Sequence, residues 1–147
     1  MSLKDQLLED LKNAMKDKEV LKKNTVQMVR AAILQVEKDS KITLDDDGIL
    51  EIIAKELKKR RDVLPEYEKS GRQDLIESLN AEAEILLQYL PRQLTEAELE
   101  VVIKQAIEET GASSARDMGK VMQAVMPKVK GKADGKMINV IAKKLLG

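Results

Sequence analysis

The chain has 147 residues, of which 43% are hydrophobic and 35% are charged, and its 26 basic side chains balance its 26 acidic ones. It contains neither cysteine nor histidine, which excludes disulfides, thiolate nucleophiles, zinc sites of the Cys/His kind and histidine-based acid–base catalysis. Tyr67 and Tyr89 are its two aromatic residues, so the core must be aliphatic, and the shortage of aromatic and threonine side chains favours an all-α fold over a sheet.

Residues 1–90 predict four helices joined by short loops, a pattern typical of an antiparallel bundle. Ser2 followed by Asp5 has the spacing of a capping box, which predicts that the first helix begins directly after Ser2. Apolar residues at helical spacing predict a second helix over residues 19–38.

The third and fourth helices are predicted on either side of Gly71, which is a stop signal. Thr43 with Asp46 predicts the start of the third helix. Pro65 should end or kink that helix, because proline lacks a backbone N–H and crowds the preceding turn. The fourth helix is expected to run to Leu90.

Four consecutive basic side chains, Lys58 to Arg61, lie within the predicted third helix. Their positions surround the helix axis, so we interpret them as a solvated face with acidic neighbours. Arg61 falls on the apolar stripe, and its aliphatic stem is expected to lie along the core while its charged head reaches water.

The Leu90–Pro91 bond is the predicted boundary between two units, because proline forces the residue before it out of the helical conformation. We expect an N-terminal helical unit over residues 1–90 and a small basic unit of three short helices over residues 91–147. The predicted caps and stops of the second unit, in chain order, are Thr95 with Glu98, Gly111, Ser113 or Ser114, Pro127 and Asp134.

Charge is unevenly distributed between these two units. Residues 1–90 carry 16 basic and 19 acidic side chains, whereas residues 91–147 carry 10 and 7. From Gly111 onward eight basic side chains face only two carboxylates, a net charge of +6. This asymmetry indicates an anionic partner.

The segment from Gly131 to Lys136 resembles a phosphate-binding loop at first sight but lacks the Walker spacing, because three residues separate its glycines where the pattern requires four. Met137 also stands where serine or threonine is required, and no strand precedes the segment. A nucleic-acid contact fits better, since glycines allow close approach and lysines supply charge. The alternative is a flexible turn with solvated lysines. The candidate binding residues are Lys120, Lys128, Lys130, Gly131, Lys132, Gly135 and Lys136.

Three methionines, Met118, Met122 and Met126, share a helical spacing with Val121 and Val125. We interpret this stripe first as core, and alternatively as a pliable groove for a protein partner of the C-terminal unit. No motif in the chain specifies catalysis, and we expect no metal and no cofactor. Because no apolar run approaches the roughly 20 residues of a transmembrane helix and the acidic N-terminus lacks a signal-peptide core, we expect a cytoplasmic protein without a membrane span.

Several segments spread over the whole chain resemble the GatB/YqeY domain, and in particular its stand-alone form, the YqeY family. The segments that carry the resemblance are Met1–Lys4, Ala14–Lys16, Arg30–Ile33, Lys55–Arg60, Tyr89–Leu94, Gly111–Ser114, Asp117–Met122 and Met126–Gly135. Pro65 departs from the family, in which a different residue is usual at this position.

The resemblance implies a small bacterial protein of two helical parts. The same domain forms the tail of the B subunit of the glutamine-dependent tRNA amidotransferase, where it is held to engage the tRNA while chemistry occurs on other domains. The leading hypothesis is therefore a binding module for tRNA, or for a tRNA-bearing assembly, without catalysis of its own. One alternative, implied by the family, is a component of a carbon–nitrogen ligase with glutamine as amido-N-donor. The other is a protein–protein adaptor.

Overall fold

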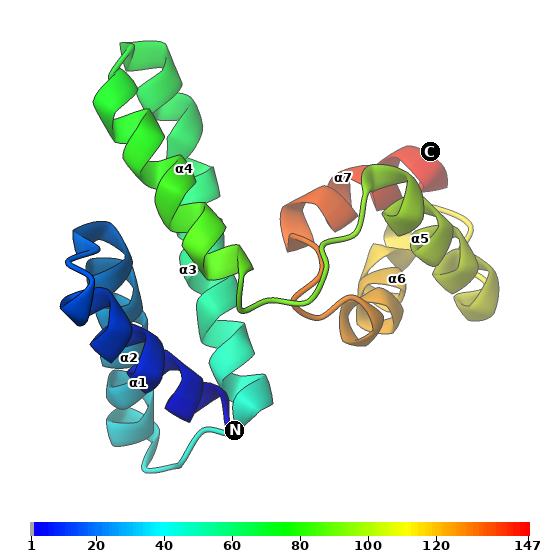
Figure 1. Cartoon of the computed structure of the whole chain (residues 1–147). Helices are drawn as coiled ribbons and strands as arrows, with labels where there is room; N and C mark the ends of the chain where they lie inside the picture. Colours follow the sequence, from blue (N-terminus) through cyan, green and yellow to red (C-terminus); the bar gives the residue numbers. More distant parts are fainter. Residues whose placement is uncertain (1) are drawn as a thin grey trace. The chain divides into compact units, whose positions relative to one another are not determined.

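The computed structural model describes residues 2–147, and over these residues it contains seven α-helices, two 3-10 turns and no strand (Figure 1). The all-α prediction is confirmed. The described residues divide into two compact units, one ending at Leu90 and the other spanning Pro91–Gly147. Each has a hydrophobic core of its own, and we call them the N-terminal and C-terminal units.

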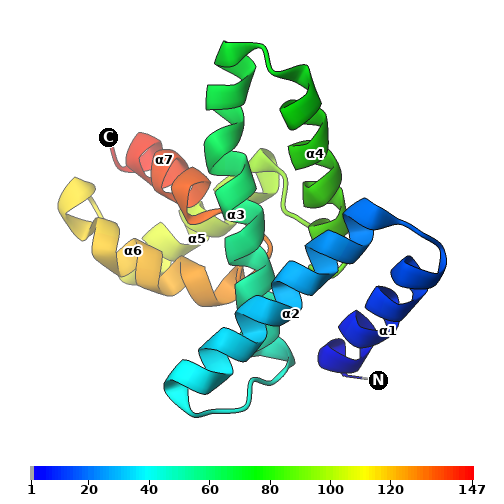
Figure 2. The same ribbon diagram turned by 90° about the vertical axis from the view of Figure 1, so that its left-hand side faces the viewer.

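The first two helices form a hairpin (Figure 2). α1 spans Leu3–Lys16, and the Ser2 hydroxyl accepts the backbone N–H of Asp5 at 3.1 Å, so the predicted cap is confirmed. α2 spans Val20–Ser40, close to its predicted range. It ends at Lys41, which adopts the left-handed conformation with φ 54°.

A second hairpin is formed by α3, Asp46–Ser70, and α4, Gln73–Leu87 (Figure 2). The predicted cap of α3 at Thr43 is wrong by two residues. Asp45 takes this position, and its carboxylate accepts the N–H of Gly48 at 2.9 Å. A carboxylate both satisfies an unpaired N–H and complements the positive end of the helix dipole, so it is favoured at this position.

α3 continues through Pro65 to its stop at Gly71, so the predicted end of the helix at the proline is wrong. Proline removes one backbone hydrogen bond to the fourth residue before it. Here α3 packs against α4, and this packing outweighs the loss. Gly71 closes the helix at φ 71°, as predicted.

The core of the N-terminal unit is aliphatic and draws on all four of its helices. Its buried members are Leu7, Leu11, Val26, Val29, Ile33, Ile49, Ile52, Ile53, Leu57 and Leu86. At the end of the unit the Tyr89 hydroxyl donates a hydrogen bond to the carboxylate of Asp10, which ties this segment to α1. Burial, followed by the neighbouring Asp10 carboxylate, raises the pKa of Tyr89 above its usual range.

Arg60, and not Arg61, is the arginine that α3 buries. The Arg60 side chain is 8% exposed and its Nη1 donates to the backbone carbonyl of Glu56 at 2.9 Å and to its Oε2 at 3.1 Å. Arg60 Nε lies 3.5 Å from Oε2 of Glu82, and Nη2 donates to the sulfur of Met28. The predicted solvated face is therefore wrong at Arg60, because two carboxylates neutralise its charge inside the unit.

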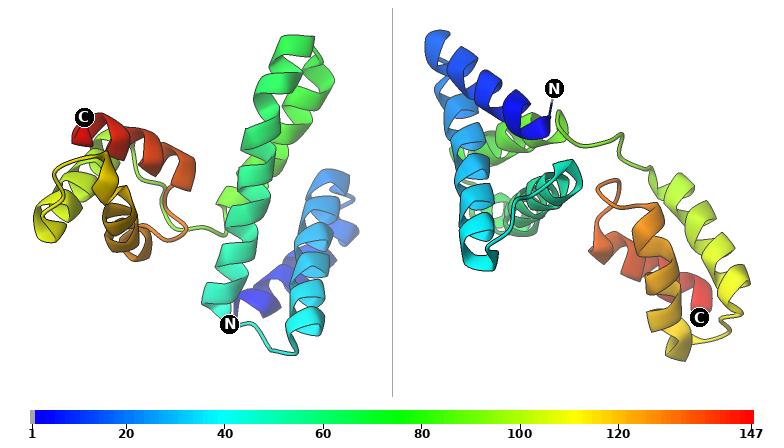
Figure 3. Two further views of the ribbon diagram at one scale, coloured as in Figure 1. Left: turned by 180° about the vertical axis from the view of Figure 1, so that it is seen from behind. Right: turned by 90° about the horizontal axis from the view of Figure 1, so that it is seen from below.

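The C-terminal unit contains three α-helices and both 3-10 turns (Figure 3). α5 spans Glu96–Thr110, α6 spans Met118–Val125 and α7 spans Gly135–Leu146. The 3-10 turns span Ala115–Asp117 and Met126–Lys128.

The predicted helix signals of the C-terminal unit are confirmed with one change. Thr95 and Glu98 form a reciprocal capping box, and Gly111 ends α5 at φ 69°. Asp134 caps α7 through the N–H of Lys136. Ser114, however, caps the first 3-10 turn and not α6 itself.

The core of the C-terminal unit joins one face of each of its helices. Its buried members are Leu99, Ile103, Ala106, Val121, Val125, Val129, Ile138, Ile141 and Ala142. Met118 and Met122 are partly buried against this core, which supports the interpretation of the methionine stripe as core. Met126 is 44% exposed and does not belong to it.

Candidate nucleic-acid interface

Residues 128–136 run from the second 3-10 turn into the first turn of α7 and contain six of the seven predicted binding residues. We call them the basic loop. Lys128, Lys130, Lys132 and Lys136 all expose their side chains. Lys120, the seventh residue, is exposed on α6 outside the loop. The loop therefore presents four of the predicted lysines within nine residues.

Val129 anchors the first half of the basic loop in the core. Its side chain is 1% exposed, while Lys128 and Lys130 on either side of it face solvent. Lys132 donates its backbone N–H to the carbonyl of Val129 at 2.8 Å, which closes a turn around Gly131. The lysines thus project from a backbone that is fixed to the core at one residue.

Of the two glycines in the loop, only Gly131 adopts a conformation that favours glycine. Its φ is 73°, in the left-handed region. Gly135 opens α7 with no such requirement, and a Cβ added there would meet no atom within 4 Å. The surface at Gly135 is therefore open, which leaves room for a ligand to approach the backbone.

The segment Pro91–Leu94, which precedes α5 and which we call the strap, forms hydrogen bonds with the backbone of the basic loop. Gln93 Nε2 donates to the carbonyl of Gly131 at 2.7 Å and to that of Pro91 at 3.1 Å. The N–H of Leu94 donates to the carbonyl of Lys132 at 2.9 Å. Sequence patterns did not predict this contact, because 38 residues separate Gln93 from Gly131.

Both carboxylates after Gly111 are engaged by backbone N–H groups. Asp117 accepts the N–H of Ser113 at 2.9 Å, and this bond holds the pKa of the Asp117 carboxyl below its usual value. Asp134 accepts the N–H of Lys136 at 3.1 Å. Lys128 in turn donates to Glu109 of α5 at 3.0 Å.

The tyrosines of the chain both precede Pro91, so the C-terminal unit has no aromatic side chain on which a base could stack. Single-stranded RNA is usually bound through such stacking. Lysines on a fixed loop instead suit phosphate oxygens of a folded or double-stranded RNA. The loop therefore offers positive charge without a surface for base stacking.

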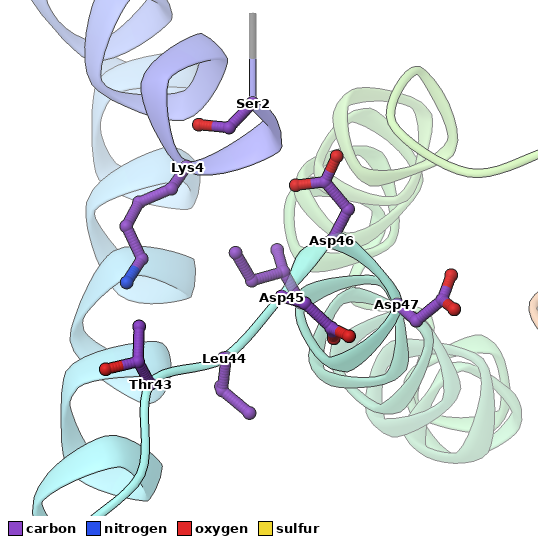
Figure 4. Close-up of a pocket in the computed structure, with 8 residues that line it drawn as sticks. Ser2, Lys4, Thr43, Leu44, Asp45, Asp46 and Asp47 are labelled. Carbon is purple, nitrogen blue, oxygen red and sulfur yellow. The ribbon is translucent and has the colours of Figure 1, made fainter.

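A shallow depression of about 540 Å³ lies where α1 and α3 begin (Figure 4). Asp45 and Asp46 already accept backbone N–H groups, from Gly48 and Leu3 respectively, each at 2.9 Å. In Figure 4 the carboxylates of Asp45, Asp46 and Asp47 point in different directions. Across residues 2–147 no group of three or more acidic side chains is arranged to hold a metal ion. Asp45 caps α3, and Asp46 accepts the first backbone N–H of α1.

These features define a class of protein, a two-unit helical chain with a basic loop on its smaller unit. The comparison with protein families refines that class. The model of the Yqey-like protein family matches residues 4–146, and the chain therefore belongs to this family. No helix within the described residues is both long and apolar enough to cross a membrane.

The chain is also similar to curated fungal proteins named "Altered inheritance of mitochondria protein 41, mitochondrial". It is 34% identical over 128 residues to the one from Pyrenophora tritici-repentis, which covers 84% of this chain and 69% of that protein. It is 38% identical over 84 residues to the one from Kluyveromyces lactis, which covers 56% of this chain and 45% of that protein. It is 31% identical over 111 residues to the one from Lachancea thermotolerans, which covers 74% of this chain and 59% of that protein. The family is thus not confined to bacteria, and the chain spans between about half and two thirds of these relatives.

Proposed function

We propose that this chain is a binding module for tRNA or a tRNA-bearing assembly, and that the basic loop of the C-terminal unit contacts RNA phosphates. The observation that carries the proposal is the geometry of the loop. Four exposed lysines project from a backbone that Val129 and the strap hold in place. Fixed cations of this kind bind a polyanion by releasing its counterions.

Catalysis of its own is not part of this proposal. The chain has neither cysteine nor histidine, and no nucleotide-binding loop. A contribution to glutamine-dependent amide transfer, which the family resemblance implies, would have to come from binding the tRNA while other subunits supply the chemistry. The cytoplasm is the proposed location, and the names of the fungal relatives make the mitochondrion the alternative that cell fractionation would test.

The experiment is a titration of total tRNA at several salt concentrations with the wild-type protein and a variant in which Lys128, Lys130, Lys132 and Lys136 are replaced by Gln. The slope of log affinity against log salt should fall by roughly 0.7 to 0.9 for each phosphate contact that is lost. The fold should survive, because the interactions of exposed lysines contribute little to stability.

A matched control replaces four exposed lysines of the N-terminal unit, which are Lys16, Lys38, Lys58 and Lys69. This control changes the net charge equally and should retain the wild-type slope. A similar loss in both variants would show that only net charge matters. Equal affinities and slopes for wild type and the loop variant would eliminate the loop as an RNA site and place the protein–protein adaptor first.

A further inference from the structure

Two hydrogen bonds join the strap to the basic loop, and a third lies within the strap. Both amide hydrogens of Gln93 have an acceptor, the carbonyls of Gly131 and Pro91. The next residue, Leu94, adds its backbone N–H to the carbonyl of Lys132. Successive carbonyls of the loop are therefore bound by successive residues of the strap.

The strap is itself held in place on both sides of Gln93. Leu94 packs against the core of the C-terminal unit. Arg92 forms a two-bond ion pair with Glu98, at 2.9 and 2.6 Å, in the first turn of α5. Gln93 is partly buried between Arg92 and Leu94, so its side-chain amide is already ordered in the free protein. Ligand binding to the loop therefore carries no further entropy cost for ordering this side chain.

The bonds from the strap act on the part of the loop that carries its lysines. Gly131 stands between Lys130 and Lys132, and its left-handed φ of 73° sets the direction in which the chain turns between them. A glycine at this position samples many conformations unless its peptide groups are held. The bond from Gln93 to the Gly131 carbonyl, together with that from Leu94 to the Lys132 carbonyl, selects one of them.

We infer that Gln93 is a positioning residue of the proposed RNA site, acting through the Gly131 carbonyl to fix where Lys130 and Lys132 project. This inference rests on the proposed function, because it names the residue that preorganises the loop for its anion. Gln93 touches the loop backbone and need not touch RNA. Without the Gln93 amide, the loop would lose conformational entropy each time it binds RNA, and the affinity would fall. The number of phosphate contacts would stay the same.

The test replaces Gln93 by Leu, which is close to it in size and removes both donors. The control replaces Gln105 by Leu, an exposed glutamine on α5 of the same unit. Amide hydrogen exchange at Leu94 and Lys132 should become about fivefold faster or more in Gln93→Leu, because a hydrogen bond of ordinary strength is lost. Exchange at these two residues should not change in Gln105→Leu.

The same two variants are then titrated with total tRNA over several salt concentrations. Gln93→Leu should bind roughly three- to tenfold more weakly than wild type, the cost of ordering a few groups, with the salt slope of the wild type. If Gln93→Leu melts below the assay temperature, Gln93→Glu, which keeps the side-chain volume, replaces it and is compared with Gln105→Glu.

The outcomes separate the inference from the proposed function. Wild-type protein that fails to bind tRNA at low salt overturns the proposed function. Wild-type protein that binds, with faster exchange but undiminished affinity in Gln93→Leu, overturns the positioning role alone. Unchanged amide exchange at Leu94 and Lys132 in Gln93→Leu overturns the claim that Gln93 holds the loop. A lower salt slope in Gln93→Leu than in wild type shows that Gln93 acts through phosphate contacts and not through the position of the loop.

Discussion

Both terminal guanidinium nitrogens of Arg92 donate hydrogen bonds to the carboxylate of Glu98, at 2.9 Å to Oε1 and 2.6 Å to Oε2. The same carboxylate accepts the backbone N–H of Thr95, whose hydroxyl accepts the N–H of Glu98 in return. Hydrogen bonds from Arg92 and then from Thr95 lower the pKa of Glu98 to about 2. One side chain therefore both caps α5 and holds the strap.

The lowered pKa of Glu98 predicts a pH dependence. Since the pKa is lower in the folded than in the unfolded state, the stabilisation is fully present above the ordinary value of 4.5 and is lost as the pH falls toward about 2. Glu98→Gln should therefore melt at a lower temperature than wild type at neutral pH, and the difference should shrink across this acid range. Thermal melts followed by circular dichroism test it, with Glu96→Gln in the same helical turn as the control. A difference that is constant with pH would contradict the prediction.

Removal of Arg60 should destabilise the N-terminal unit strongly. Arg60→Ala would remove the cation shared by Glu56 and Glu82. Breaking a buried pair on one side costs up to about 3 kcal/mol here, because Lys59 still pairs with Glu56. The matched control is Arg61→Ala, an exposed neighbour for which a change within about 0.5 kcal/mol is expected. Urea unfolding of both variants measures the free energies. Equal effects would mean that Arg60 is as solvated as Arg61.

Val121 tests the core of the C-terminal unit. Its side chain is fully buried, so Val121→Asp places a carboxylate among aliphatic groups and should unfold the unit, at a cost of several kcal/mol. The control Val140→Asp changes a valine that is 63% exposed and should leave the melting temperature almost unchanged. Unchanged melting of Val121→Asp would show that the stripe on α6 is exposed and would favour the adaptor hypothesis.

The two glycines of the basic loop should respond in opposite ways to the same added methyl group. Gly131→Ala forces a left-handed φ of 73° on a residue with a Cβ and should cost about 1 to 2 kcal/mol. Gly135→Ala meets no atom within 4 Å at the start of α7 and should stabilise the protein by about 0.4 to 1 kcal/mol. Thermal melts of both variants decide the point, and a stabilising Gly131→Ala would place the loop in another conformation.

The division at Leu90–Pro91 leads to a prediction for limited proteolysis. Trypsin should cut first at exposed basic residues outside the α-helices, which include Arg92 and the lysines of residues 128–133. In the N-terminal unit Lys18, Lys41 and Arg72 meet the same condition. Lys104 provides an internal comparison, since it is also exposed but lies within α5. Early cleavage after Lys104 would show that α5 is not a stable element and would argue against the unit boundaries proposed for the chain.

Local signals in the sequence were enough to predict most of the helices. Ser2, Gly71, Thr95 with Glu98, Gly111 and Asp134 each act within four residues of their own position, and each stands at a helix end in the structure. Thr43 failed as a cap because Asp45, a stronger acceptor two residues later, competes for the same role. Pro65 failed as a breaker because packing between α3 and α4 overrides a local preference.

The features that could not be predicted depend on residues far apart in the chain. Burial of Arg60 and not Arg61 follows from the position of Glu82 on another helix. The strap is the second example, since nothing within several residues of Gln93 indicates that its amide reaches Gly131. The lysines of the candidate site could be found by composition alone, whereas the backbone contacts that direct them needed the three-dimensional structure.

The location of both tyrosines in the N-terminal unit has a practical consequence for spectroscopy. Tyr67 and Tyr89 both precede Leu90, so ultraviolet absorbance, fluorescence and near-ultraviolet dichroism of the native protein report on the N-terminal unit alone. The unit with the basic loop carries no intrinsic chromophore in this range, and its binding or melting would pass unseen in such a signal. A tryptophan introduced at an exposed position such as Val140 would give that unit a reporter of its own.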